Sequence, residues 1–479
     1  MRFLSLAALA VLPVAAPAQR APIGAADSAL VVRILLAEDR RDSTDAALSE
    51  GSRHADERIR VLARRARARI TDPTFASRDS LPPLPAPPVW PEPSWRLRYR
   101  ELAARREDCG ALRAALADSA WPVRLRAAGL ATNACSGDEA LVATIRRWVD
   151  SLPGDASTRA SGSVSWHAAA HGIVALARLR PDEARTLLVR LAGHRQWQVR
   201  VYAARAAAVV SDTARLRTLA RDPDDNVKEA AIDALAELTG HDDDAVFIGA
   251  LGASGAQAVR AAARALKGSP RADARAAANE AFERWAERDN ESERDVRVAL
   301  LEAAGRPASD DRPPAVRIEI PPGAVALALG AEKRLQITMA PTSGGGSFVV
   351  RLRGDVAPLM AARILALARD GYYDGLSWQR VEHDFVIQGG SPGASEYVGS
   401  PRYLRDELGT VPHLRGTVGM STRGYDTGDA QWFVNLRDNL RLGRAYTVFA
   451  EVIDGIEVVD GILEGDIIAA IEVFPGSSR

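Results

Sequence analysis

One short stretch of the 479-residue chain, residues 380–390, combines a permanent cation, an aromatic ring and an amide at close spacing. The alternating side chains up to Arg380 predict a strand, and the run from Phe385 to Gln388 predicts a second strand after a turn. A guanidinium keeps its charge when it is partly removed from water, so Arg380 could donate hydrogen bonds to a group held in an apolar slot beside Phe385. This chemistry needs neither a metal ion nor a covalent intermediate.

The surrounding residues predict a set of short strands and a helix that would hold this stretch in place. Alternating apolar residues predict strands at 335–339 and 348–352, joined by a hairpin turn at 344–346. Residues 358–371 predict an amphipathic helix, with proline in its first turn and glycine at its end. Short antiparallel strands with capping helices predict a closed antiparallel β-barrel.

Several blocks of this region, in the same order and with the same spacing, resemble the cyclophilin-type peptidyl-prolyl isomerases, and the resemblance covers residues 334–474. The blocks are Val-Ala-Pro at 356–358, Tyr-Tyr-Asp-Gly at 372–375, Trp-Gln-Arg-Val at 378–381, Phe-Val-Ile-Gln-Gly-Gly at 385–390, Gly-Thr-Val-Gly-Met-Ser at 416–421, Asp-Thr-Gly-Asp-Ala-Gln-Trp-Phe-Val at 426–434 and Tyr-Thr-Val-Phe-Ala-Glu-Val at 446–452. The resemblance implies a cyclophilin-like barrel that accelerates rotation of X-Pro bonds without a cofactor or metal.

The resemblance also implies a role for each site residue. Arg380 would donate to the prolyl nitrogen and localise the lone pair that otherwise makes the amide rigid, while Gln388 would hold the arginine and the substrate. Phe385 completes the catalytic set. The pocket and its edge would be formed by Phe385, Val386, Met420, Phe433, Leu442 and Tyr446. The backbone at Ser421 and Thr422 would grip the substrate chain, and Gln431 would support its carbonyl side.

Three positions depart from the family's pattern. Val386 stands where the family often has methionine, Thr422 where it often has asparagine, and Arg441 where it has an aromatic residue. The change at Arg441 predicts weak inhibition by cyclosporin, and Arg423 with Arg441 would bias the pocket toward acidic substrates. These departures leave a second hypothesis open, in which the domain is a weakly catalytic or non-catalytic scaffold or chaperone that binds proline-containing segments.

Residues 95–306 contain a repeated pattern that resembles HEAT repeats. A valine followed by arginine or lysine precedes an alanine-rich helix at intervals of roughly 30–40 residues, the length of a two-helix unit. The pattern recurs at Val123, Val199, Val227, Val259 and Val296, with a degenerate copy at Trp166. We therefore expect an α-solenoid whose extended concave surface binds a client or a protein partner.

Two residue pairs in the repeats suggest local chemistry. Cys109 opens the first helix of a predicted unit and Cys135 closes its second, so antiparallel packing would bring them together in a disulfide. The alternative to this disulfide is a pair of buried free thiols. His167 and His171 share one face of a predicted helix, but no carboxylate or cysteine stands at helical spacing beside them, which favours packing or capping over a metal site.

The N-terminal part predicts export. Residues 1–18 have a basic start, an apolar run and a small-x-small site, which together are typical of a signal peptide cleaved near Ala18. The run is too short to span a membrane comfortably, and we predict a periplasmic or secreted protein without an integral membrane span. Lys and Arg number 62, as do Asp and Glu, so net charge gives no argument for nucleic-acid binding.

The domain prediction follows from these segments. After the signal peptide, residues 19–80 predict helices, with a solvated face made of Arg60, Arg64, Arg65, Arg67 and Arg69. Residues 81–94 form a proline-rich linker, or a strap along the next domain with Trp90 as its anchor. The repeats occupy 95–306, a linker 307–315, and the cyclophilin-like domain 316–479.

Overall fold

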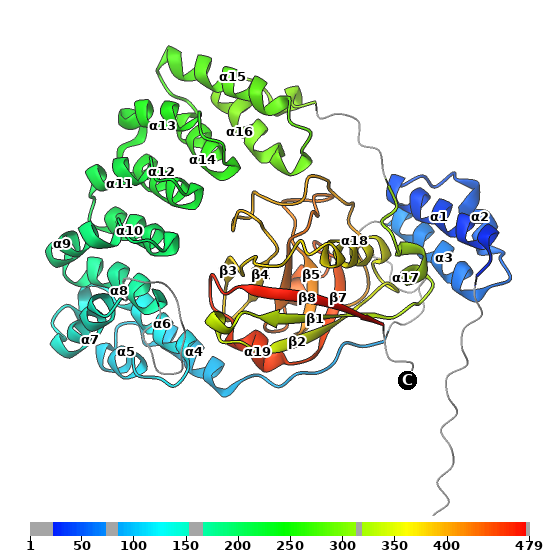
Figure 1. The fold of residues 1–479 in the computed structure, drawn as a ribbon, viewed down its shortest axis with the longest axis horizontal. Coiled ribbons are helices and arrows are strands. Elements are labelled where there is room, and N and C mark those ends of the chain that lie inside the picture. Colours follow the sequence, from blue (N-terminus) through cyan, green and yellow to red (C-terminus); the bar gives the residue numbers. More distant parts are fainter. Residues whose placement is uncertain (1–22, 73–84, 153–165, 313–318, 476–479) are drawn as a thin grey trace, which may run out of the picture.

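A computed structural model describes residues 23–72, 85–152, 166–312 and 319–475. The predicted signal peptide, residues 1–18, lies outside the described residues. Figure 1 shows three groups of elements: an arc of helices, a curled β-sheet on the inner side of the arc, and a small group of helices on the opposite side of the sheet. The sheet, with the helices between its strands, is called the sheet domain (residues 319–475) below.

The arc is an α-solenoid of paired helices, as the HEAT-like pattern predicts. Its helices are α4 (Ser94–Ala104), α5 (Cys109–Ala115), α6 (Trp121–Leu130), α7 (Glu139–Asp150), α8 (Trp166–Leu179), α9 (Pro181–Leu191), α10 (Trp197–Val209), α11 (Thr213–Leu219), α12 (Asp225–Thr239), α13 (Asp244–Ala250), α14 (Ala256–Leu266), α15 (Ala272–Ala286) and α16 (Arg294–Ala303). Figure 1 shows α6, α8, α10, α12, α14 and α16 on the inner side of the arc. Each of these inner helices packs against the next, so one apolar core runs along the arc.

The valine that marks each predicted unit is a core residue of an inner helix. Each is at most 1% exposed: Val123, Val199, Val227, Val259 and Val296. Buried alanines beside them let neighbouring helices approach closely. The valine pattern in the sequence therefore marks the residues that pack between the helices of the solenoid.

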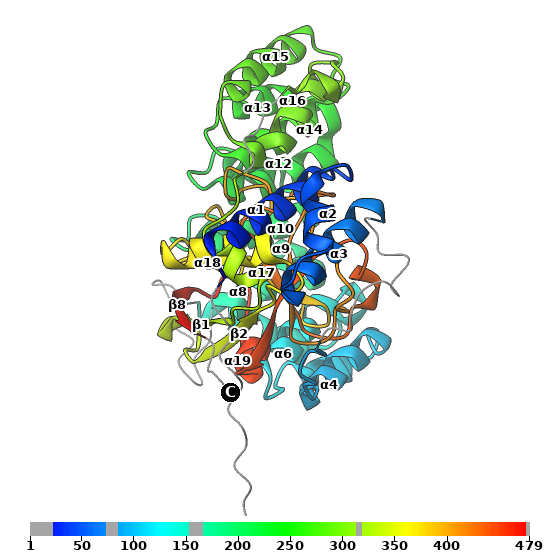
Figure 2. The ribbon, with the colours of Figure 1, turned by 90° about the vertical axis from the view of Figure 1, so that its right-hand side faces the viewer.

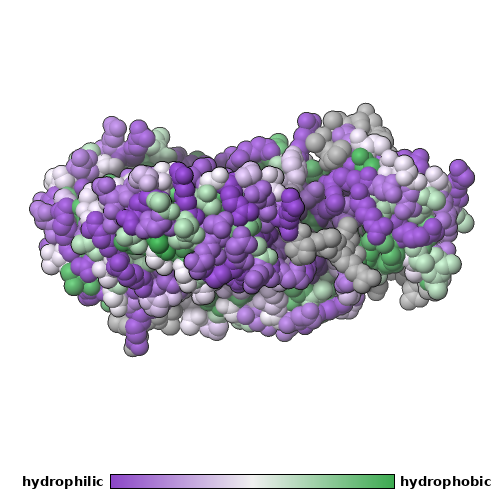
Figure 3. Space-filling view, turned by 90° about the horizontal axis from the view of Figure 1, so that it is seen from above, coloured by the Kyte–Doolittle hydropathy of each residue, from purple (hydrophilic) through white to green (hydrophobic). Residues whose placement is uncertain are grey.

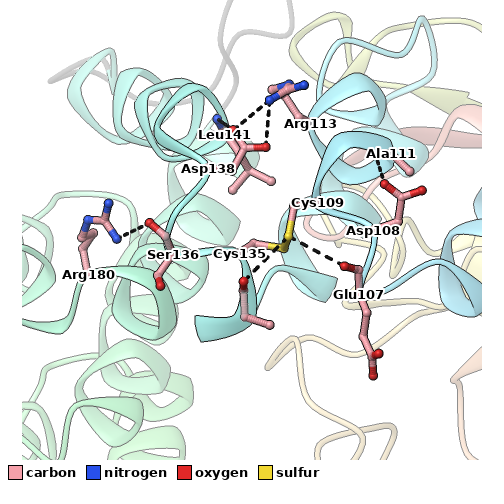
Figure 4. Close-up of a disulfide and its surroundings, with 11 residues drawn as sticks. Glu107, Asp108, Cys109, Ala111, Arg113, Cys135, Ser136, Asp138, Leu141 and Arg180 are labelled. Atoms are coloured by element: carbon pink, nitrogen blue, oxygen red, sulfur yellow. Dashed lines mark hydrogen bonds and ion pairs between the residues drawn. A yellow bond between two sulfur atoms is a disulfide. The ribbon is translucent and has the colours of Figure 1, made fainter.

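A disulfide closes the first hairpin of the arc (Figure 4). Cys109 begins α5, and Cys135 ends a short 3-10 helix (Asn133–Cys135) that follows α6. The two residues thus lie at the same end of one helical hairpin. Beside them, Arg113 pairs with Asp138 at 2.8 Å, so a covalent and an ionic link join the same two segments.

Replacing Cys109 and Cys135 with alanine is expected to lower the free energy of unfolding of the arc by about 3 kcal/mol, because the disulfide restricts the unfolded chain. Thermal unfolding followed by far-ultraviolet circular dichroism would measure the effect. Reduced wild type should then unfold like the double variant. Equal stability of the oxidised wild type and the variant would contradict this expectation.

The N-terminal helices do not continue the arc. Helices α1 (Ala25–Arg40), α2 (Ala46–Ser52) and α3 (Glu57–Thr71) lie beside α17 (Ala324–Ala328) and α18 (Pro358–Arg369), on the side of the sheet away from the arc (Figures 1 and 2). Their apolar residues belong to the same core as the sheet domain. These helices are therefore packed as part of the sheet domain's own core, across the sheet from the repeats.

Two arginines of α3 contradict the prediction of a solvated arginine face. Arg65 and Arg69 are each 6% exposed and pair with Glu38 of α1 at 3.2 and 2.5 Å. They also donate to backbone carbonyls of the sheet domain, Arg65 to Asp355 and Arg69 to Leu408. Burial opposes ionisation of Glu38, but the two guanidinium groups outweigh it and lower the pKa of that carboxyl. Arg65 and Arg69 therefore form a buried polar contact between α3 and the sheet domain.

The described part of the proline-rich segment, from residue 85 onward, is a strap with Trp90 as its anchor. The indole nitrogen of Trp90 donates to the carbonyl of Val452 at 3.2 Å. Gly416 leaves room for the ring, since a Cβ there would lie 2.6 Å from it. Arg415 donates to the carbonyl of Pro91 at 3.1 Å. The strap therefore lies on the sheet domain. The sequence suggested instead that it would lie along the repeats, which follow it directly in the chain.

The sheet contains eight strands in the order β3-β4-β6-β5-β7-β2-β1-β8, with antiparallel pairing throughout. The strands are β1 (Lys333–Met339), β2 (Ser347–Leu352), β3 (Arg380–Val381), β4 (Val386–Gly389), β5 (Thr417–Met420), β6 (Trp432–Asn435), β7 (Val448–Asp454) and β8 (Ile468–Pro475). The hairpin between β1 and β2 turns at 344–346, where all three glycines have positive φ.

The predicted closure of the barrel is wrong, because the sheet is a half-barrel with β3 and β8 at its two edges. Across the gap, residues 375–378 and 465–468 are joined by backbone hydrogen bonds, and Ser377 forms isolated bridges with Ser391 and Ile467, but β3 and β8 themselves do not pair. The physical reason is an offset along the strands. The residues that meet the start of β8 precede β3, so the two edges pass each other before a ladder can form. Helices α18 and α19 (Ile456–Gly461) cap the curled sheet.

The surface seen from above the arc is predominantly hydrophilic, with hydrophobic side chains scattered over it (Figure 3). Among the helices of the described residues, none combines the length and apolar character that a membrane crossing requires.

Candidate functional site

Neighbouring strands place Arg380, Gln388 and Phe433 in one row across the sheet. Arg380 on β3 is directly opposite Gln388 on β4, and Gln388 is directly opposite Phe433 on β6. The row continues to Gly419 on β5, which is opposite Phe433. Directly opposed residues of an antiparallel pair project from the same face. A guanidinium, an amide and an aromatic ring therefore stand side by side on one face of the sheet.

That face carries a small apolar cluster separate from the main core. Side chains alternate between the two faces, and Ile387 and Val434, the neighbours of the row, belong to the main core. The opposite face carries a separate apolar cluster of Val386, Phe433 and Leu442, with Phe385 and Tyr446 packed at its edge. This cluster is called the apolar pocket below, after the pocket that the sequence predicts from these residues. Five residues predicted from the sequence to form a pocket thus come together.

Phe433 is the floor of the apolar pocket, and its position depends on a glycine. A Cβ at Gly419 would lie 2.4 Å from Cζ of Phe433, so only glycine lets the ring lie over β5. The ring of Tyr446 meets it edge-on, with centroids 5.7 Å apart. The ring of His413 stacks on it at the same centroid distance and an interplanar angle of 18°. Phe433 is therefore fixed on several sides.

Gln431 connects the row to a neighbouring loop. Its Oε1 accepts hydrogen bonds from Gln388 at 3.3 Å and from Gln379 at 2.9 Å. Its Nε2 donates to the carbonyls of Glu396 and Val398 at 3.0 and 3.2 Å. Gln431 is 1% exposed and Gln388 is 4% exposed. Both amides are therefore held in fixed orientations beside the pocket.

Arg380 is the accessible member of the row. Its side chain is 46% exposed, and the carboxylate of Glu382 lies 4.0 Å away. The guanidinium carbon lies 5.9 Å from the ring centroid of Phe385. The guanidinium of the exposed Arg441 also lies over that ring, at 4.7 Å. A group seated in the apolar pocket would therefore meet a positive rim.

The other predicted site residues fall at different depths. Met420 is fully buried opposite Trp432 in the main core, so the structure does not bring it into the apolar pocket. Ser421 and Thr422 are half-buried at the end of β5, where the amide of Ser421 donates to the carbonyl of Gln431 at 2.9 Å. Their backbone therefore lies next to Gln431.

Arg423 does not supply a charge to the pocket. Its guanidinium pairs with Asp295 of α16 at 2.6 Å and with the buried Asp429 at 3.7 Å. The predicted acidic bias therefore has no support from this residue, because its charge is compensated within the protein. Arg441 keeps an exposed guanidinium on the rim.

A buried polar network beneath the pocket was not predicted. His413 is fully buried and donates from Nε2 to the carbonyl of Tyr446 at 3.0 Å, while its Nδ1 accepts from Asn435 at 3.1 Å. Asn439 donates to the carbonyl of Phe385 and to Oδ1 of Asn435. Burial lowers the pKa of His413 to about 4, so the ring is neutral at pH 7. The network fixes both aromatic edges of the pocket, and its members carry no local motif.

Residues 382–384 contact the first helix of the arc, α4. The ring of His383 packs edge-on against Trp95 and Tyr99 of α4, with centroids 6.0 Å away in each case. Arg96, which is fully buried, donates to the carbonyl of His383 at 3.0 Å and pairs with Asp460 at 2.9 Å. The repeats therefore hold the turn that carries Phe385.

A carboxyl on the inner helix α12 makes stability depend on pH. Burial, followed by repulsion from Asp233, raises the pKa of Glu229 on α12 to about 7. The folded protein then keeps a proton that the unfolded chain loses above pH about 4.5. This contribution to stability is full at acid pH and is lost as the pH rises toward 7.

The Glu229→Gln variant should therefore be more stable than wild type by about 3 kcal/mol at pH 8 and equally stable at pH 4. Denaturant unfolding at both pH values measures the difference. Glu237→Gln, at an exposed position of the same helix, is the matched control and should change neither value. A stability gain that is the same at pH 4 and pH 8 would contradict the assignment.

Comparison with known proteins yields matches for both regions. A model of the family described as "Cyclophilin type peptidyl-prolyl cis-trans isomerase/CLD" matches residues 336–471, and a model of HEAT repeats matches residues 184–267. A peptidyl-prolyl cis-trans isomerase of Helicobacter pylori is 35% identical over 136 residues, which cover 28% of this chain and 83% of that protein. Peptidyl-prolyl cis-trans isomerase B of Bacillus subtilis is 33% identical over 132 residues, which cover 27% and 92%. A crystal structure of a Cryptosporidium parvum cyclophilin type isomerase covers 30% of this chain and 99% of its own, at 23% identity and a TM-score of 0.28.

Proposed function

Because the chain belongs to the cyclophilin-type peptidyl-prolyl cis-trans isomerase family, we propose that its sheet domain accelerates rotation of X-Pro bonds in exported polypeptides. The observation that carries this proposal is the row of Arg380, Gln388 and Phe433 beside an apolar pocket. A proline ring fits an apolar pocket, and the amide nitrogen that it carries would lie toward the guanidinium on the rim.

The proposed mechanism acts on the electronic origin of the barrier. Rotation about the amide costs about 18–20 kcal/mol because the nitrogen lone pair is delocalised into the carbonyl. As the bond twists, the nitrogen becomes pyramidal and its lone pair can accept a hydrogen bond. A guanidinium at Arg380 donates to that lone pair only in the twisted state, so it stabilises the transition state more than the ground state.

Arg380 cannot supply the whole acceleration. A ten-thousand-fold acceleration requires about 5.4 kcal/mol. One hydrogen bond to a charged group contributes about 1.5–3 kcal/mol. We propose that the remainder comes from the apolar pocket, which removes water from the amide, and from Gln388 and Gln431, which are already oriented before substrate binds.

We also propose that the protein acts outside the cytoplasm. The signal-peptide pattern of residues 1–18 supports export. The disulfide between Cys109 and Cys135 is consistent with it, because disulfides persist in oxidising compartments. N-terminal sequencing of the protein recovered from the extracytoplasmic fraction should begin at Gln19. Recovery of the uncleaved chain from the cytoplasm would argue against export.

The repeats are proposed to serve the same function by binding protein. HEAT repeats bind through their concave side, but here inner helices contact the sheet domain of the same chain. We therefore propose that the repeats bind their own isomerase domain first, and that clients or partners meet the surface that remains.

The direct test is isomerisation of a short Ala-Pro peptide by the purified chain. The proposed function predicts acceleration of the cis-to-trans step in proportion to protein concentration. The departures at Val386, Thr422 and Arg441 favour a second candidate, a scaffold that binds proline-containing segments. That candidate predicts saturable peptide binding without acceleration, and this result would replace the enzyme with a receptor.

A further inference from the structure

Successive inner helices of the arc contact the sheet domain through polar side chains. The contacts are His167 of α8 and Tyr202 of α10 to Glu464, Asn226 of α12 and Gln257 of α14 to Gly393, and Asp295 of α16 to Arg423. All of these arc residues except Tyr202 occupy the second position of their helix. The inner side of the arc is thus a built interface along its length.

Two of these contacts meet at one carbonyl beside the site. Asn226 and Gln257 both donate to the carbonyl oxygen of Gly393, at 3.1 and 3.4 Å. The guanidinium carbon of Arg260 on α14 lies 3.5 Å from the ring centroid of Tyr397. Both targets belong to residues 391–398, called the site loop here. Adjacent inner helices therefore hold the two sides of one loop.

The site loop is also connected to the row of Arg380, Gln388 and Phe433, through Gln431. The carbonyls of Glu396 and Val398 accept the two hydrogen bonds from Nε2 of Gln431. The Oε1 of Gln431 then accepts from Gln388, the direct neighbour of Arg380 across the sheet. Two links, one from the loop to Gln431 and one from Gln431 to Gln388, thus connect the site loop to the row.

The tip of the site loop is held from inside the loop, where Ser391 accepts hydrogen bonds from the backbone amides of Gly393, Ala394 and Ser395, and also by side chains of the repeats. Its base is closed by Ser391, whose hydroxyl donates to the carbonyl of Val398 at 2.7 Å. At the tip, Ala394 has a φ of 49°, in the left-handed region that is unfavourable for a residue with a side chain. Such a conformation persists where surrounding contacts determine it. The donors from Asn226 and Gln257 reach the adjacent residue, Gly393.

From these contacts we infer that Asn226, Gln257 and Arg260 of the repeats are positioning residues for isomerisation. They fix the site loop, the loop fixes the amide of Gln431, and Gln431 fixes Gln388 beside Arg380. The helical repeats are thereby an integral part of the enzyme's active conformation. This inference rests on the proposed isomerase function, because its consequence is a rate.

The test compares wild type with Asn226→Leu/Gln257→Met, which removes both donors at nearly constant volume. We expect kcat for an Ala-Pro peptide to fall on the order of tenfold, because the catalytic amides lose their fixed orientation. KM should stay within about twofold, because the apolar pocket is untouched. Arg260→Met, which removes the contact with Tyr397, should shift kcat in the same direction.

The matched control is Tyr202→Phe, which removes the hydrogen bond to Glu464 in the same interface but away from the site loop. It should leave both constants unchanged. Equal kcat in the double variant and wild type, or an equal fall in Tyr202→Phe, would overturn the inference by showing that the interface is only structural.

A second readout does not depend on turnover. Hydrogen exchange of the backbone amides at 393–398 should become at least about tenfold faster in the double variant and stay unchanged in Tyr202→Phe. Unchanged exchange in the double variant would overturn the inference. If wild type itself showed no turnover, the proposed function would fail, while the exchange result would still decide whether the repeats hold the loop.

Discussion

The Arg380→Ala variant is expected to lose about 100-fold in kcat/KM for an Ala-Pro peptide and to keep its stability. One hydrogen bond from a charged donor is worth about 1.5–3 kcal/mol, and the upper part of that range corresponds to about 100-fold. Because the side chain is 46% exposed, its removal should change the free energy of unfolding by less than about 0.5 kcal/mol. A protease-coupled peptide assay and thermal unfolding measure the two quantities.

The control for this variant is Arg437→Ala. Arg437 has a similar exposure, 43%, and pairs with Asp384 at 3.1 Å near the same rim. Its removal should change kcat/KM by less than about twofold if the effect of Arg380 depends on its place in the row rather than on charge near the pocket. Comparable losses in both variants would show that only the overall potential matters and would remove Arg380 from its assigned role.

The Gly419→Ala variant is expected to damage the pocket while changing only one methyl group. The added Cβ would lie 2.4 Å from Cζ of Phe433, so the ring must move away from β5. Overpacking of this kind costs about 1–3 kcal/mol of stability. We also expect kcat/KM to fall at least about tenfold, because the floor of the pocket is displaced.

Gly461→Ala, at a position of α19 where a Cβ would meet nothing within 4 Å, is the matched control in the same domain. It should leave stability and activity near the wild-type values. A Gly419→Ala protein with normal activity would show that Phe433 does not form the floor of the working site.

The sequence was most informative where one feature depends on residues close together in the chain. The valine pattern of the repeats reflects contacts between successive helices, and it identified the core positions of α6, α10, α12, α14 and α16. The site row could be anticipated because the blocks around Arg380, Gln388 and Phe433 resemble those of a known family. The spacing of Cys109 and Cys135 likewise reports a single helical hairpin.

Features that depend on distant segments were not predicted. The offset between β3 and β8, which leaves a half-barrel, cannot be derived from the alternation pattern of either strand. Arg65 and Arg69 belong to a run that looks solvated until Glu38 and the sheet domain are placed beside it. Met420 was assigned to the pocket by its block, whereas strand alternation places it on the opposite face from Phe433.

The interface between the repeats and the sheet domain corresponds to a weak pattern in the sequence. Asn226 and Asp295 each directly precede a repeat valine, and Gln198 does so in a third repeat. A polar residue at the start of an inner helix, where the side chain points along the inner side of the arc, is typical of a binding surface. The pattern could therefore have indicated an occupied inner face, although it could not have identified the chain's own sheet domain as the occupant.

The central claim is that the row on β3, β4 and β6 rotates a prolyl bond, and magnetisation exchange between the cis and trans resonances of an Ala-Pro peptide tests it most directly. The method observes rotation at equilibrium, without a coupled protease. We predict exchange cross-peaks with substoichiometric wild-type protein and, at the same concentration of Arg380→Ala, an exchange rate that is lower by about 100-fold. Shifts of the peptide resonances that report binding to wild type, without exchange cross-peaks, would contradict the claim.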